Sequence, residues 1–378
     1  MKRWLFLLVL LVGLAVLSAC SAGEKATPAP ASPTAAVKAA WEQEWERVLA
    51  AAQREGKVTI IADMRGPEHR QALTEAFERK YGITVEHLGI ASAEAVPRIQ
   101  TERAGGQYLW DIHIGGHMPM LTLLKEGIYD PVEPALILPE VKDGKNWLGG
   151  DLGFVDKNRT GLLMFTYSGT AAWVNTDMVK PDEIKSWKDL LDPRWRGKIV
   201  AADPRVAGPG QAAFSMFYAH KDLGPDFIRE LVKHELVFAR DYGTIPRELA
   251  QGKYAICLGC PDAYSTPLMK QGLPIRPVDP RKVREGGYLS GGNGVLWLLN
   301  RPPHPNAAKV YINWLLSKEG QTTVARPNGF PSRRVDVPNS DWTPPELTPD
   351  LKFWNAYTEE GAVVREPLVS LLREILRD

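Results

Sequence analysis

The sequence lacks a surplus of charge of either sign, because 46 Lys and Arg residues stand against 45 Asp and Glu residues. A nucleic-acid-binding protein would need a basic surplus, so we expect no nucleic acid as a partner. Cysteine is also scarce, with three residues in 378. Cys257 and Cys260 are spaced as Cys-Leu-Gly-Cys, but no second cysteine pair and no histidine cluster accompanies them, which argues against a zinc site.

The common signatures of enzymes are missing as well. Gly-x-Ser-x-Gly and the Walker A sequence do not occur, and His234-Glu235 has no second histidine at metalloprotease spacing. Gly208-Pro209-Gly210 opens a partial dinucleotide fingerprint, but its offset from the preceding strand makes it a poor cofactor site. We therefore predict no enzyme and no cofactor, and keep a secreted enzyme or a ligand-sensing domain as the alternatives from other classes.

No apolar run is long enough for a transmembrane helix, yet the first residues carry the features of an export signal. Lys2 and Arg3 precede a short apolar run at residues 4–17. The run ends in Leu-Ser-Ala-Cys20, which resembles a bacterial lipobox and predicts a signal peptide over residues 1–19 with lipidation of Cys20. The alternative is an ordinary signal peptide that leaves Cys20 as a free thiol.

Residues 20–40 are poor in large side chains and predict a flexible tether. Acyl chains on Cys20 would attach the folded part to a membrane. We expect an extracytoplasmic location, in the periplasm or at the cell surface, with the membrane as a partner through the lipid anchor.

Beyond the tether, helical and strand patterns alternate. A helical pattern at residues 41–54 precedes a strand at 57–62, a helix at 71–81 and a strand at 83–87, which together predict a βαβ unit. The length exceeds what one core usually supports, so we expect an α/β protein of two lobes, each a mostly parallel sheet flanked by helices.

Two extended stretches, at residues 161–175 and 288–299, are interrupted only by small polar residues. They suit two crossover strands at a hinge between the lobes. We assign residues 41–168 plus 294–378 to lobe 1 and residues 169–293 to lobe 2.

Three segments carry a family resemblance. Residues 189–199 (DLLDPRWRGKI), 249–256 (LAQGKYAI) and 308–321 (AKVYINWLLSKEGQ) resemble, in the same order, segments of extracellular solute-binding proteins of the ferric-iron-binding type. The resemblance covers residues 55–330. It implies a two-lobed periplasmic-binding-protein fold of type II and a function in solute uptake, with a small-molecule solute and the permease of an ABC transporter as partners. We expect a monomer.

The resemblance leaves the solute open. Iron-binding members place two adjacent tyrosines shortly after the segment that matches Gly252-Lys253-Tyr254, and here the corresponding stretch, residues 257–264, contains Tyr264 alone. We therefore favour a small organic anion or an amine and predict no resident metal. A ferric-iron protein that uses His117, Tyr242 and Tyr264 is the alternative.

The site residues follow from where the strands end. Ligands of open α/β sheets bind beyond the carboxyl ends of the strands, where glycine-rich loops lead into helices and expose backbone N–H groups to an anion. Tyrosines near the crossovers would suit a cation or a flat ring. The candidate solute-binding residues are Arg65, Gly66, Gly116, His117, Tyr167, Ser168, Gly208, Gly210, Tyr242, Gly243, Tyr264 and Asn293. For Cys257 and Cys260 we expect either a local disulfide or two unreactive thiols. A thioredoxin-like redox pair would stand at the start of a helix, whereas this pair ends an apolar strand.

Overall fold

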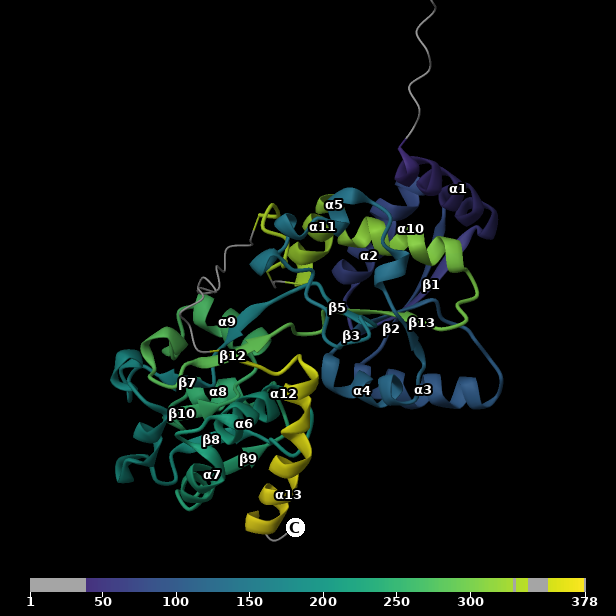
Figure 1. The fold of residues 1–378 in the computed structure, drawn as a ribbon. Coiled ribbons are helices and arrows are strands. Elements are labelled where there is room, and N and C mark those ends of the chain that lie inside the picture. Colours follow the sequence, from purple (N-terminus) through teal and green to yellow (C-terminus); the bar gives the residue numbers. More distant parts are fainter. Residues whose placement is uncertain (1–38, 329–330, 339–352, 377–378) are drawn as a thin grey trace, which may run out of the picture. The chain divides into compact units, whose positions relative to one another are not determined.

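The computed structural model describes residues 39–328, 331–338 and 353–376 (Figure 1). The predicted signal peptide, almost all of the tether and the lipidation site Cys20 lie outside these residues. Among the helices that the structure describes, none has the length and apolar character needed to cross a bilayer.

The first sheet joins strands from distant parts of the chain. Its order is β2 (Thr84–Gly89), β1 (Lys57–Ala62), β3 (Ile112–Gly115), β13 (Val295–Leu299) and β4 (Tyr129–Asp130), and β5 (Gly161–Leu163) also pairs with β13. Strand β1 is parallel to β2 and β3, whereas β13 is antiparallel to β3. The parallel part confirms the predicted βαβ unit, and the returning strand β13 adds the antiparallel part.

Helices cover both faces of this sheet. They are α1 (Ala40–Glu55), α2 (Pro67–Tyr81), α3 (Ser92–Ala104), α4 (His117–Lys125), α10 (Pro305–Leu316) and α11 (Lys318–Asn328), and the short α5 (Pro139–Lys142) lies in the connection after β4. Neighbouring residues of β1 face opposite sides, so Ile60 packs in one hydrophobic cluster with α2 and α10, and Ile61 packs in another with α3 and α4.

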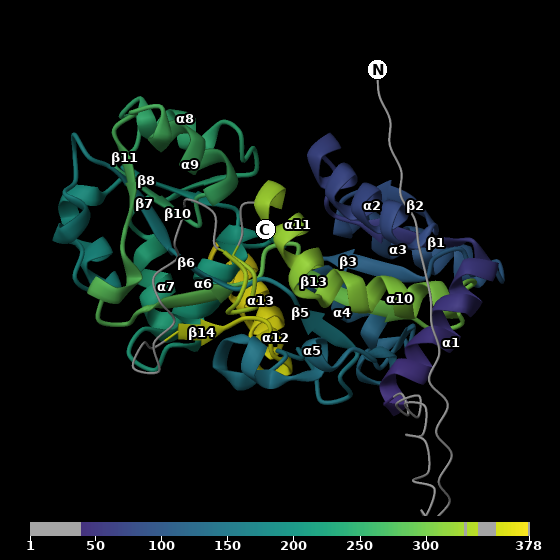
Figure 2. The same cartoon turned by 90° about the horizontal axis from the view of Figure 1, so that it is seen from above.

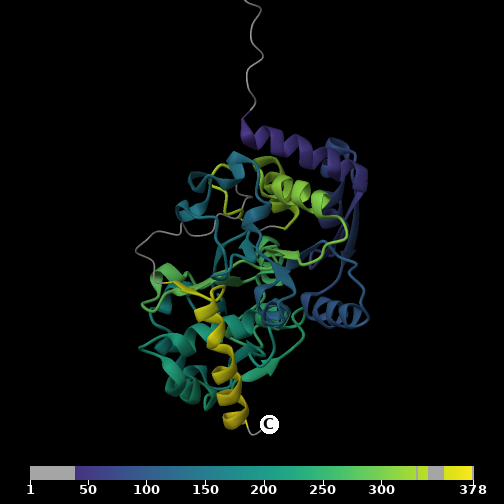
Figure 3. The same ribbon diagram turned by 45° about the vertical axis from the view of Figure 1, so that its right-hand side comes forward.

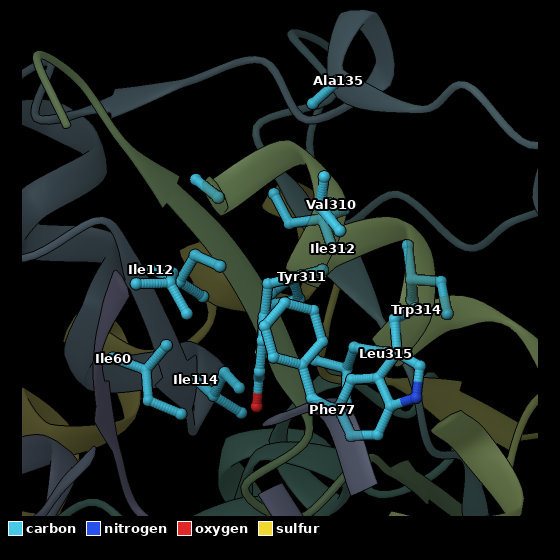
Figure 4. Close-up of a cluster of buried hydrophobic side chains, with 14 of the residues drawn as sticks. Ile60, Phe77, Ile112, Ile114, Ala135, Val310, Tyr311, Ile312, Trp314 and Leu315 are labelled. Carbon is cyan, nitrogen blue, oxygen red and sulfur yellow. The ribbon is translucent and has the colours of Figure 1, made fainter. Parts of the chain in front are cut away.

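Aromatic rings fill the first of these clusters (Figure 4). The Phe77 ring centroid lies 4.9 Å from that of Tyr311 and 5.4 Å from that of Trp314. The Tyr311 hydroxyl donates to the Leu73 carbonyl at 2.8 Å, which satisfies its one buried polar group. Burial of each such side chain contributes about 1.5–3 kcal/mol to the stability of the fold, so the sheet holds the loops at its edge in place.

The second sheet has the order β11 (Ile275–Pro277), β7 (Ala172–Asn175), β10 (Ile256–Leu258), β8 (Ile199–Ala202) and β9 (Val237–Ala239). Strands β10, β8 and β9 are parallel, and β7 is antiparallel to both of its neighbours. The helices of this part are α6 (Pro209–Ala219), α7 (Gly224–Val232), α8 (Ile245–Ala250) and α9 (Asp262–Lys270) (Figure 2).

Two crossover strands connect the sheets. The chain leaves β5, forms β6 (Tyr167–Gly169) and enters β7, and it later returns through β12 (Gly287–Ser290) to β13. Strands β6 and β12 pair antiparallel with each other. The predicted double crossing is confirmed, and the first stretch is interrupted at residues 164–166 and again at residues 170–171.

The C-terminal segment corrects part of the domain assignment. Strand β14 (Phe353–Asn355) pairs parallel with β12, and α12 (Glu359–Val363) and α13 (Arg365–Leu376) follow (Figure 3). Leu368, Leu371 and Leu372 of α13 share a hydrophobic cluster with Phe214 and Phe227 of the second sheet's helices. The prediction assigned residues 294–378 to lobe 1, but α13 completes the second core, because its apolar face packs on α6 and α7.

Candidate functional site

Loops gather at the carboxyl ends of the parallel strands of both sheets. We call residues 63–66, 92, 116–117 and 290–293 the first half-site, and residues 203–210, 240–243 and 259–262 the second half-site. Each half-site follows from the topology, because neighbouring parallel strands end at the same edge of a sheet.

Asp63 organises the first half-site. Its Oδ2 accepts hydrogen bonds from the backbone N and the hydroxyl of Ser92, both at 3.0 Å, and Ser92 Oγ accepts from the backbone N of Gly116 at 3.0 Å. The Asn293 side-chain amide donates to the Asp63 carbonyl. The structure thus brings the predicted residues Gly116 and Asn293 together through Asp63 and Ser92, which the prediction missed although Asp63 directly follows a strand.

Arg65 and Gly66 lie on the rim of this half-site. Arg65 Nε is 3.2 Å from Asp63 Oδ1, and the Arg65 side chain is 62% exposed while that of Asp63 is 21% exposed. Gly66 precedes the first turn of α2. The pair balances its own charge, so the first half-site offers no net charge to a ligand.

His117 is buried behind these loops at the start of α4. Its ring stacks on Trp297 at a centroid distance of 6.1 Å and lies 5.7 Å from the ring of Tyr357, and neither ring nitrogen has a hydrogen-bond partner among the described residues. Burial lowers the pKa of His117 to about 4, so the ring is neutral at pH 7. In this arrangement His117 supports the wall of the half-site. Tyr357, whose hydroxyl is 3.4 Å from Ser290 Oγ, is a neighbour that no sequence pattern indicated.

A buried carboxylate organises the second half-site. Asp203 is 2% exposed, and it accepts hydrogen bonds from Arg205 Nε at 2.9 Å, Arg205 Nη2 at 3.0 Å and Arg240 Nε at 2.8 Å. Burial raises the pKa of Asp203, but the hydrogen bonds from the two guanidinium groups outweigh it and hold that pKa at about 2. Two positive groups around one negative group leave these three residues with a net charge of +1, and the second half-site also contains the acidic residues Asp241 and Asp262. The prediction missed all three residues.

Two glycines allow the backbone to pass close to its neighbours here. A Cβ on Gly210 would lie 2.0 Å from the Ala202 carbonyl oxygen, and a Cβ on Gly208 would lie 2.1 Å from the Tyr242 hydroxyl. The predicted residues Gly208, Gly210 and Tyr242 therefore do lie together. Burial and then the charge of Asp203 raise the pKa of Tyr242. Gly243 is turned toward Asp241, to which its backbone N donates at 2.9 Å.

The remaining predicted residues are placed as follows. Tyr264 lies in the first turn of α9 with an exposed side chain. Tyr167 and Ser168 lie in β6, opposite Ser290 and Leu289 of β12. No contact that the structure records links His117 with Tyr242 or Tyr264, and within the described ranges no group of three or more His, Cys, Asp or Glu residues could hold a metal ion.

Cys257 and Cys260 form a disulfide with a Cα–Cα distance of 5.5 Å, which confirms one of the two states that we expected. The sequence analysis placed this pair at the end of a strand and away from any helix start. The structure corrects that, because α9 begins at Asp262, two residues after Cys260. Burial raises the pKa of Asp262 to about 6, although the 2.8 Å hydrogen bond that Trp173 Nε1 donates to it acts to lower that pKa.

A groove of about 470 Å³ lies between α2 and α11, apart from the predicted residues. Glu68, Glu75, Arg79 and Thr323 contribute to its lining. It contains none of the candidate solute-binding residues, so the loops at the strand ends remain the candidate site.

The chain is similar to several known proteins. A family model described as bacterial extracellular solute-binding protein matches residues 72–349. An uncharacterised Haemophilus influenzae protein is 28% identical over 260 residues, which cover 66% of this chain and 70% of that protein. A Salmonella typhimurium protein, provisionally named as 2-aminoethylphosphonate-binding and periplasmic, is 26% identical over 204 residues. These cover 46% of this chain and 58% of that protein.

Among solved structures, the periplasmic binding protein AfuA of Actinobacillus pleuropneumoniae, with fructose-6-phosphate bound, superimposes with a TM-score of 0.63 at 21% identity. The match covers 85% of this chain and 99% of that one. At this identity the likeness establishes the fold, a type II periplasmic-binding-protein fold.

Proposed function

Because the chain belongs to the bacterial extracellular solute-binding proteins, we propose that it captures a small organic anion and passes it to the permease of an ABC importer. The observation that carries the choice of an anion is the exposed Arg240 guanidinium, which shares the Asp203 carboxylate with Arg205. Arg240 is anchored through Nε, yet its side chain is 68% exposed, so its remaining N–H groups can reach a ligand.

The neighbouring backbone supports the same choice. Gly208 directly precedes α6, and the N–H groups in the first turn of a helix have no partner within that helix. They favour a carboxylate, phosphate or phosphonate group. The Asp63–Arg65 pair cancels its own charge, so we assign the acidic end of the solute to the second half-site and its other end to the first.

Binding then works without any chemical change in the solute. A solute that contacts both half-sites stabilises the closed arrangement of the lobes over the open one, which is how a receptor signals that it is loaded. We propose that the protein is not an enzyme and acts as a monomer.

One observation favours an amine as the second candidate. The partly exposed Asp63 carboxylate could accept a hydrogen bond from an ammonium group, and Tyr242 offers an aromatic face. A solute carrying both an amine and an acidic group would satisfy both half-sites.

Identification of the bound solute tests the proposal. Mass spectrometry and metal analysis of what the purified protein releases should yield an organic acid or phosphorus compound, and a thermal-shift panel should contain 2-aminoethylphosphonate, fructose-6-phosphate, spermidine and ferric citrate. At a hundred times Kd a ligand stabilises the protein by about 2.7 kcal/mol, which is easily measured.

Arg240→Gln should weaken the binding of an anionic ligand at least tenfold. The matched control is Arg196→Gln, because Arg196 is an exposed arginine outside the half-sites. Stabilisation by spermidine or iron alone would contradict the anion proposal.

The membrane anchor is a separate proposal. We propose that residues 1–19 are removed and that Cys20 carries the lipid, with residues 20–40 as tether. Metabolic labelling with a fatty acid should label the wild-type chain, while Cys20→Ser should be unlabelled. Equal labelling of both would contradict it.

A further inference from the structure

The disulfide lies directly behind the second half-site. Cys257 is the middle residue of β10, Cys260 follows the strand, and both side chains are buried. The two residues that the disulfide encloses are Leu258 and Gly259. This short ring fixes the backbone at the point where β10 turns toward α9.

Gly259 presses against the first turn of α6. Its φ of +58° is in the left-handed region, and a Cβ on Gly259 would lie 2.4 Å from Gly210 Cα and 2.8 Å from the Pro209 carbonyl oxygen. The backbone of the disulfide ring therefore contacts the backbone of the glycine loop directly, with no side chain between them.

Gly210 is held from a second side. A Cβ on it would lie 2.0 Å from the Ala202 carbonyl oxygen at the end of β8. The backbone N of Gly259 donates to the Ala171 carbonyl at 2.8 Å, which ties the disulfide ring to the chain that leads into β7. The start of α6 is thus enclosed between the end of β8 and a turn that the disulfide and this hydrogen bond hold in place.

We propose that the Cys257–Cys260 disulfide is a positioning element for solute binding, which keeps the N-terminal turn of α6 in place through Gly259. Opening it loosens the loop that receives the anionic group. The effect on affinity rests on the function proposed above, while the effect on the loop does not.

Reduction is a defined chemical step here. A small dithiol such as dithiothreitol supplies two electrons and two protons, the Cys257–Cys260 S–S bond breaks to give two thiols, and the dithiol closes to its own cyclic disulfide. Both sulfurs are buried, so exchange with a large protein partner is disfavoured and a small reductant is the suitable probe.

Hydrogen–deuterium exchange on the full chain tests the inference without any ligand. Compared with the oxidised protein, the dithiothreitol-reduced protein and the variant C257A/C260A should both exchange at least tenfold faster in peptides covering residues 208–214. Peptides from β1 and α10 should be unchanged. Faster exchange confined to residues 257–265, with residues 208–214 unaffected, would overturn the proposal.

A variant with the disulfide intact separates positioning from the disulfide itself. Gly259→Ala should also accelerate exchange at residues 208–214, because its Cβ displaces Gly210. Dithiothreitol should change nothing in C257A/C260A, which controls for other effects of the reductant.

Affinity is the second measurement. If the oxidised protein binds 2-aminoethylphosphonate or fructose-6-phosphate, reduction should weaken binding at least fivefold, and an unchanged Kd would refute the role in binding. If it binds neither, these two anions are not its solutes, and the exchange data decide the positioning role alone.

Discussion

The two half-sites differ in how deeply their carboxylates are buried and in how closely their glycine loops are packed. In the second, Asp203 is buried between two guanidinium groups, and the backbone at Gly210 touches its neighbours so closely that no side chain fits. In the first, Asp63 is partly exposed, and a Cβ on Gly116 would meet nothing closer than 3.8 Å, although one on Gly291 would lie 2.2 Å from Leu163 Cδ1. The comparison teaches that the loop at Gly210 is preorganised, whereas the loop at Gly116 has room to adapt to a solute.

The largest expected difference between them concerns their glycines. Gly210→Ala should cost more than about 3 kcal/mol or prevent folding, because its Cβ meets a backbone carbonyl that cannot move aside. Gly116→Ala should cost less than about 1 kcal/mol, since φ is −72° and space is open. Urea unfolding measures both. Equal losses would remove the contrast between the half-sites.

The next largest difference in stability is expected between substitutions of the two carboxylates, Asp203 and Asp63. Asp203→Asn should destabilise by about 1–3 kcal/mol, since it removes the buried carboxylate that accepts hydrogen bonds from Arg205 and Arg240, while Asp63→Asn should cost under about 1 kcal/mol. The folded-state pKa of Asp203, about 2, lies below its ordinary value of 3.8. Its stabilising contribution is therefore present above pH 4 and lost as the pH falls through 2. The wild-type acid-unfolding curve should show this loss, and the Asp203→Asn curve should not.

A smaller effect of opposite sign is expected at Asp262. Its folded pKa is raised from 3.8 to about 6, so the protonated form is favoured, and wild-type stability falls as the pH rises from about 4 to 6. Asp262→Asn keeps an oxygen that can accept from Trp173 Nε1 and should gain about 1 kcal/mol at pH 7. The gain should vanish below pH 4. Thermal unfolding at pH 7 and pH 3.5 checks this, and a gain of equal size at both values would contradict the assignment to Asp262.

The smallest expected effect is at the rim of the first half-site. Arg65→Ala removes an exposed ion pair and should change stability by less than about 0.5 kcal/mol. The same substitution should weaken binding of an identified solute only if Arg65 touches it, so isothermal titration calorimetry decides its role. A large loss of stability would show that the rim is held more firmly than the comparison implies.

The sequence predicted β1, α2 and β2 of the first sheet to within a few residues, because apolar periodicity marks them clearly. It also placed Gly208, Gly210 and Tyr242 correctly near one another, since they follow neighbouring parallel strands. The sequence did not predict ion pairs such as Asp203 with Arg240, because the two loops are far apart in the chain and no local pattern marks the pair.

The C-terminal helix was misassigned for a related reason. Its leucine pattern predicts an amphipathic helix correctly, but the pattern is the same whichever core it covers. Only the pairing of β14 with β12 and the packing of Leu372 show that it belongs with the second sheet.

That packing has a consequence for how the chain folds. The second core contains Ala171 near its beginning and Leu372 near its end, and the first core likewise unites Val58 with Leu315. Neither core can close until late segments have emerged, and contacts between such distant residues form slowly. A nascent chain of this kind stays unfolded longer, which suits passage through a translocation channel before the lobes become compact.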